Sequence, residues 1–121
     1  MQPPHPAVSF LHSHCQRARQ VLAKSGVTVR GISRKGTPKP EATFSDYLSA
    51  DPCNPNEEVI SRVRSASVIV SCVPPGPCVR ALEALAPYMS EGCLFLDVLS
   101  VKTEICNSYN QLKVCCCPAC C

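Results

Sequence analysis

Residues 67–77 read Ser67-Val-Ile-Val-Ser-Cys-Val-Pro-Pro-Gly-Pro77, a continuous apolar run of strand length that stops at a cluster of prolines. A strand without polar alternation is typical of a parallel sheet that is covered on both faces. Residues 93–99 form a second run of this kind, and residues 78–89 between them carry apolar side chains at helical spacing. The stretch therefore predicts a strand, a helix and a second strand parallel to the first.

The same alternation extends outward on both sides. Upstream, the pattern predicts a short strand at 7–11, a helix at 15–25 and a strand at 27–33, with Gly26 at positive φ after the helix. Asn54 is predicted to cap a helix that carries Pro55 at its first position and runs to Ala66. Downstream, Ser100 is predicted to cap a helix at 101–112. The fold class is therefore α/β, with a mostly parallel sheet flanked by helices.

The connection from 34 to 55 is rich in proline and polar residues, and we expect no strand in it. Phe44, Tyr47 and Leu48 are expected to pack at most one short helical turn. With 121 residues the chain fits one small domain, which we place at 7–113 after a disordered lead at 1–6 and before a Cys-rich tail at 114–121. No apolar run approaches the roughly 20 residues that span a bilayer, so we expect no membrane segment.

Positive charge is concentrated at the front of the chain, where residues 1–40 contain seven Lys or Arg and no acid. A targeting peptide, a nucleic-acid or phosphate patch and chance all account for this pattern. The structured strand at 27–33 argues against a long cleavable peptide, and the few aromatics and short basic runs argue against nucleic acid. Eleven cysteines without a secretory signal favour a reduced, cytoplasmic protein, although targeting to an organelle stays open.

Candidate binding residues follow the predicted strands, because parallel sheets bind ligands beyond the carboxyl ends of their strands. Ser33, Arg34 and Lys35 end the strand at 27–33. In dinucleotide folds an acid at this position holds the ribose hydroxyls of NAD, whereas a base accepts the 2′-phosphate of NADP. The Arg-Lys pair therefore favours NADP, and the alternative is a solvated pair at the start of a loop.

Two further strand ends carry candidate residues. Val73, Pro74 and Pro75 offer a rigid backbone that would lie against the nicotinamide ribose, or that simply stops the strand before a helix. Ser100 would bond a substrate carboxylate or the nicotinamide amide, and Lys102 would attract an anion. The alternative for these two is a helix cap and a surface lysine.

The segment from Ser65 to Lys102 resembles the superfamily of 6-phosphogluconate, 3-hydroxyisobutyrate and prephenate dehydrogenases. The resemblance is carried by the strand at 65–74, by Leu82-Glu-Ala-Leu-Ala-Pro87 and by Leu94-Phe-Leu-Asp97 followed by Ser100-Val-Lys102. The stretch from Gly26 to Arg34 is similar to the second strand of that superfamily. The resemblance implies an NAD(P)-binding Rossmann domain whose intact relatives move hydride between NADP and a small hydroxyacid.

The chain departs from this superfamily at its glycine-rich loop, where Phe10, His12 and Cys15 occupy the glycine positions. Side chains there block the close approach of backbone N–H groups to a pyrophosphate. Ser67 stands where the family shows Asp, and the family's catalytic Lys or His belongs to a later helical domain. We therefore expect a truncated domain with weak or absent cofactor binding, no catalytic residue and no turnover.

Two other functions stay open at this stage. One is a non-enzymatic interaction fragment that keeps the sheet and has lost the cofactor, with a homodimer among its forms. The other is a metal-binding protein that acts through Cys117, Cys120 and the neighbouring thiols of the tail. Because no second ligand pair with zinc spacing is evident, no metal ligands are assigned.

Overall fold

A computed structural model describes residues 7–11, 16–34, 46–100 and 102–112 of the chain. The predicted lead at 1–6 and the Cys-rich tail at 114–121 lie outside these ranges, as do Lys35 and the two glycine-loop positions His12 and Cys15. In chain order the elements are β1 (Ala7–Leu11), α1 (Gln16–Lys24), β2 (Thr28–Ser33), β3 (Asp46–Ser49), α2 (Glu57–Arg64), β4 (Val68–Ser71), α3 (Pro75–Leu85), the 3₁₀ turn η1 (Ala86–Tyr88), β5 (Leu94–Asp97) and α4 (Thr103–Leu112).

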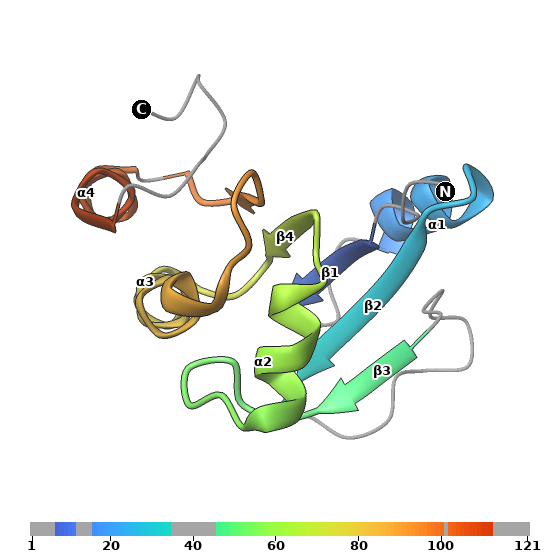
Figure 1. Cartoon of the computed structure of the whole chain (residues 1–121). Coiled ribbons are helices and arrows are strands. Elements are labelled where there is room, and N and C mark those ends of the chain that lie inside the picture. The colour runs from blue at the N-terminus through green and yellow to red at the C-terminus, as the bar shows by residue number, and fades with distance from the viewer. Residues whose placement is uncertain (1–6, 12–15, 35–45, 101, 113–121) are drawn as a thin grey trace.

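The strands form one sheet in the order β3-β2-β1-β4-β5, and every neighbouring pair is parallel (Figure 1). This is the strand order of a Rossmann-type fold, in which the chain direction across the sheet reverses between β1 and β4. Ser71 at the end of β4 lies beside Asp97 at the end of β5. The predicted parallel pairing of these two strands is therefore confirmed.

Alternate side chains along the strands build two cores. Leu11, Ile32, Ile69 and Phe95 lie in a cluster with buried residues of α2, α3 and α4. Val8, Phe10, Val29 and Cys72 form a second cluster, against which Leu22 and Ala23 of α1 pack. The sheet is thus flanked by helices on both faces, as the apolar strands predicted. None of the helices described is long and apolar enough to cross a membrane.

The strand β3 contradicts the prediction that the connection from 34 to 55 holds no strand. Tyr47 and Leu48, expected in a helical turn, pair in parallel with Gly31 and Ile32 of β2. Both side chains are half-buried, and Phe44 lies outside the described residues. A four-residue edge strand is too short to show a clear periodicity, so its pairing partner decides its conformation.

The helix ends also differ from the predictions. Asn56, not Asn54, caps α2, because its Oδ1 accepts a hydrogen bond of 3.0 Å from the Val59 N–H. Helix α3 begins at Pro75 rather than Cys78, so the prolines fill its first turn, where their missing N–H groups are not needed. Helix α4 begins at Thr103, so the predicted cap at Ser100 is wrong.

Gly26 follows α1 with φ at +82°. This is the left-handed conformation that a helix-terminating glycine adopts without a Cβ penalty. The prediction for this position is confirmed, and the turn delivers the chain directly into β2.

Candidate functional site

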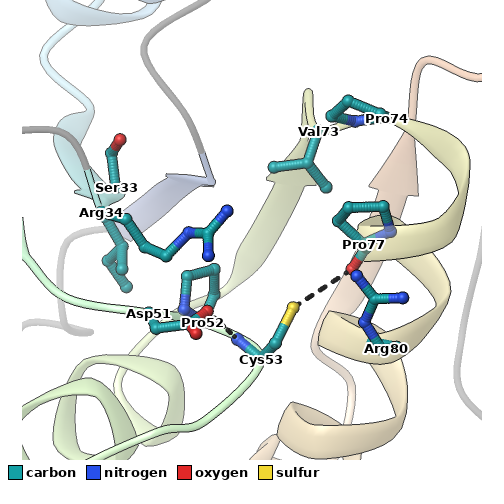
Figure 2. Close-up of a pocket in the computed structure, with 10 residues that line it drawn as sticks. Ser33, Arg34, Asp51, Pro52, Cys53, Val73, Pro74, Pro77 and Arg80 are labelled. Carbon is teal, nitrogen blue, oxygen red and sulfur yellow. Dashed lines mark hydrogen bonds between the residues drawn. The ribbon is translucent and has the colours of Figure 1, made fainter.

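A cavity of about 310 Å³ lies at the carboxyl-end edge of the sheet (Figure 2). It is bounded by the end of β2, the loop after β3, the end of β4 and the first turns of α3. Its lining residues are Ile32, Ser33, Arg34, Asp51, Pro52, Cys53, Val73, Pro74, Pro77 and Arg80.

The sheet order explains why these segments meet. Strand β1 lies between β2 and β4, so the residues that follow β2 and β4 face each other across the end of β1. The structure thus brings together four residues singled out from the sequence: Ser33, Arg34, Val73 and Pro74. Ser33 is buried, whereas Arg34 is exposed at the rim.

Three other predicted residues are not among those that line this cavity. Pro75 is exposed at the first position of α3, and Ser100 is exposed beyond the end of β5. Lys35 lies outside the described residues. The predicted set therefore divides into a group at the cavity and single residues elsewhere.

Sequence reasoning did not single out Asp51, Pro52, Cys53, Pro77 and Arg80, which also line the cavity. The first three follow β3, which the sequence pattern did not reveal. Arg80 is a single exposed residue outside the apolar stripe of its helix. The signal that marks it is its place three residues after Pro77, because residues three apart share a helix face.

The loop after β3 holds its shape through Asp51. Its Oδ1 accepts a hydrogen bond of 2.9 Å from the Cys53 N–H, and its backbone carbonyl accepts one of 3.1 Å from the Asn54 N–H. This turn is of the kind that aspartate side chains stabilise. The Asp51 carboxylate is thus engaged by its own loop.

Cys53 joins this loop to α3. Its Sγ donates to the carbonyl oxygen of Pro77 at 3.4 Å, a contact drawn in Figure 2. Burial raises the pKa of the Cys53 thiol, and the Asp51 carboxylate adds to the increase, whereas the guanidiniums of Arg80 and Arg34 oppose it. The side chain is therefore a neutral thiol at physiological pH.

Arg34 and Arg80 give the cavity its positive charge. Figure 2 shows the Arg34 side chain extending from the end of β2 toward Pro52, and the Arg80 guanidinium beside Pro77 and Cys53. Within the described part of the chain, neither guanidinium forms an ion pair. Two such groups around one cavity suit an anionic ligand.

The end of β5 carries a separate polar network around Asp97. Its carboxylate pairs with Lys102 and accepts hydrogen bonds from the Tyr109 hydroxyl at 2.7 Å and from the Leu99 N–H at 3.0 Å. Burial raises the pKa of Asp97, but these bonds outweigh it, and the pKa lies below the ordinary value. The charge of Lys102, predicted to attract an anion, is compensated by Asp97.

The Cys78 thiol lies in the core of the fold. Cys78 is fully buried, and its Sγ accepts a hydrogen bond of 3.2 Å from the Ser71 hydroxyl. Burial raises the pKa of the Cys78 thiol. The described ranges contain no group of three His, Cys, Asp or Glu placed to hold a metal ion, and Cys117 and Cys120 lie outside them.

Comparison with known proteins identifies related sequences. The family model of the prephenate dehydrogenase nucleotide-binding domain matches residues 18–116. The 4-amino-4-deoxyprephenate dehydrogenase of Streptomyces pristinaespiralis is 31% identical over 84 residues, which are 69% of this chain and 28% of that protein. Of the groups that the sequence resembles, these matches support the prephenate dehydrogenases.

Solved structures with the same fold include two from this group. Synechocystis arogenate dehydrogenase superposes with a TM-score of 0.70 at 22% identity, covering 88% of this chain and 37% of that chain. Prephenate dehydrogenase from A. aeolicus, solved with hydroxyphenyl propionate and NAD⁺, gives 0.67 at 16% identity, covering 93% and 40%. The chain thus spans less than half the length of these relatives.

Proposed function

The chain belongs to the family of prephenate dehydrogenase nucleotide-binding domains, and on this basis we propose that its cavity binds the adenosine end of a dinucleotide, with NADP preferred over NAD. The observation that carries the preference is Arg34, which directly follows β2 and lines the cavity. A base at this position favours the 2′-phosphate of NADP, and an acid favours the ribose hydroxyls of NAD. The described residues at the end of β2, Ser33 and Arg34, include no Asp or Glu that would hold the ribose hydroxyls of NAD.

The shape of the cavity supports this orientation. Val73 is half-buried and Pro74 is exposed, so the two offer an apolar wall after β4 against which an adenine ring would lie. The position agrees with the crevice where open α/β sheets bind ligands, beside the point at which the strand order reverses. Val73 and Pro74 then contact the adenosine rather than the nicotinamide ribose for which the sequence suggested them.

The nicotinamide end of the cofactor would continue toward the β5 side of the sheet. Pro75 and Ser100, both exposed, stay the predicted contacts there. When bound, the nicotinamide ring supplies the hydride acceptor of a dehydrogenase, and this chain's residues position it. The names of the relatives favour a prephenate-type substrate for the whole protein over the small hydroxyacid expected from the sequence.

We expect weak binding, because His12 and Cys15 replace glycines in the loop that cradles the pyrophosphate in this class of fold. The adenosine cavity then supplies most of the affinity. Turnover by this chain alone is not expected, since no described residue is assigned as the base that hydride transfer from a hydroxyl requires.

Calorimetry of the chain with NADP and with NAD tests the proposal. The wild-type protein is expected to bind NADP more tightly than NAD, and Arg34→Gln to weaken NADP binding by about tenfold or more, because a hydrogen bond to a charged group is lost. Lys24→Gln, which removes an exposed charge at the end of α1, is the control. No heat with either cofactor at millimolar concentration would leave the non-enzymatic fragment as the better function.

A further inference from the structure

We propose that Arg80 and Arg34 together form an anion clamp that recognises the 2′-phosphate of the cofactor adenosine, so that Arg80 is a second determinant of cofactor specificity. This inference rests on the proposed function, which assigns the cavity to a dinucleotide. It adds a residue from a different element, α3, on the opposite wall from Arg34.

The position of Arg80 is held by the contact between α3 and the loop after β3. Pro77 lies three residues before Arg80 and therefore shares its face of the helix. The carbonyl of Pro77 accepts the hydrogen bond from Cys53, which fixes that face against the loop. Both Pro77 and Arg80 line the cavity, and Figure 2 shows the Arg80 guanidinium beside Pro77 and Cys53.

The charges at the cavity favour an anion over a neutral ribose. In the described ranges, Arg34 and Arg80 make no ion pair, and the one carboxylate in the lining, Asp51, accepts the Cys53 N–H. The lining therefore has two guanidinium groups and one carboxylate, and that carboxylate is hydrogen-bonded within its own loop. A phosphate monoester carries almost two negative charges and several acceptor oxygens, which guanidinium forks match.

The topology indicates which phosphate of a dinucleotide reaches this point. The pyrophosphate in such folds lies at the N-terminus of the helix after β1. Among the described residues, the lining of the cavity comes from the ends of β2, β3 and β4 and from α3, and in such folds the residue that ends β2 contacts the adenosine ribose. It thus lies on the adenosine ribose side, where the 2′-phosphate distinguishes NADP from NAD.

The experiment compares wild type, Arg80→Gln and Arg80→Lys by calorimetry, with NADP, NAD, adenosine 2′,5′-bisphosphate and inorganic phosphate as probes. Arg80→Gln is expected to weaken NADP and bisphosphate binding by about tenfold or more, and to leave NAD binding within about twofold, because only the phosphate contact is lost. Arg80→Lys keeps the positive charge but loses the bidentate guanidinium, so its NADP affinity should lie between those of wild type and Arg80→Gln. Lys24→Gln is the control for loss of one distant charge.

A second readout needs no cofactor. Because the Arg80 guanidinium favours the Cys53 thiolate, Arg80→Gln should slow alkylation of Cys53 at fixed pH, as measured by peptide mass spectrometry. An unchanged rate would mean that the guanidinium does not lie at the cavity, which would overturn the clamp.

The outcomes separate the two proposals. If wild type binds NADP and Arg80→Gln loses NADP and NAD affinity equally, or loses neither, the clamp is wrong and the cofactor assignment stands. If wild type shows binding to inorganic phosphate as strong as to the bisphosphate, the site is a general anion site and the clamp's adenosine specificity is wrong. If wild type binds no nucleotide, the proposed function and the clamp both fail.

Discussion

The Tyr109 hydroxyl donates a 2.7 Å hydrogen bond to Oδ2 of Asp97, which ties helix α4 to the end of strand β5. The other carboxylate oxygen pairs with Lys102, and the Asp97 side chain is only 1% exposed. The Tyr109 ring also meets Phe95 edge-on, with the ring centroids 6.1 Å apart. This network stabilises the sheet edge. The contacts of Asp97 and Lys102 within it give both side chains a structural role.

Replacing Tyr109 by Phe tests the network, because the ring contact stays and only the hydroxyl is lost. The free energy of unfolding should fall by about 1.5–3 kcal/mol, as expected for a hydrogen bond to a charged acceptor. Urea denaturation followed by circular dichroism measures it. Tyr88→Phe is the matched control: that ring is half-buried beside Arg64, and removal of its hydroxyl should change stability by less than about 0.5 kcal/mol. Equal losses in the two variants would refute the assignment.

The pH dependence of stability should report Asp97. Its pKa in the folded protein lies below the ordinary value of 3.8, so the unfolded chain takes up this proton first as the pH falls. The stabilisation is therefore complete above about pH 5 and is lost as the pH falls through the folded pKa. In acid, the difference in unfolding free energy between wild type and Asp97→Asn should shrink. A difference that stays constant from pH 7 to pH 3 would contradict this.

The cap of α2 gives a direct test of the corrected helix boundary. Asn56→Ala should cost about 1 kcal/mol of stability, because the Val59 N–H loses its side-chain acceptor. Asn54 is exposed and forms its hydrogen bond to Asp51 through the backbone. Asn54→Ala should therefore change stability by less than about 0.5 kcal/mol. Thermal melts of the two variants compare them, and the reverse order would restore the boundary expected from the sequence.

Thiol reactivity should distinguish the cavity from the core. Cys53 is half-buried at the cavity, whereas Cys78 is fully buried. Iodoacetamide should alkylate Cys53 in the folded protein and reach Cys78 only after unfolding. Because its pKa is raised, the Cys53 rate should keep rising at a pH above that at which an ordinary thiol levels off.

The same measurement by site-resolved mass spectrometry tests the cofactor assignment. Saturating NADP should protect Cys53, because it fills the cavity that this thiol lines. Alkylation of Cys78 as fast as that of Cys53 in the native protein would contradict the burial. Unchanged alkylation of Cys53 at saturating NADP would place the bound nucleotide elsewhere.

Local patterns in the sequence were sufficient for the parallel strands β4 and β5, the helix between them and the left-handed Gly26. Continuous apolar runs, helical spacing and glycine conformation depend on residues that are close together in the sequence, so they can be recognised without the tertiary structure. Four of the ten residues that line the candidate site were predicted in the same way, and among them Arg34 and Val73 stand at the ends of recognisable strands.

Only the tertiary structure decided the remaining residues of the site. Strand β3 forms because its four residues pair with β2. The sequence between the two strands has no periodic pattern that would predict this pairing. The formation of β3 carries Cys53 across to α3. The sheet order, with β1 between β2 and β4, places Arg80 opposite Arg34, although 45 positions separate the two arginines in the sequence. Pairing between distant segments depends on which partners the whole sheet brings together. The spacing of residues along the chain therefore does not predict this pairing.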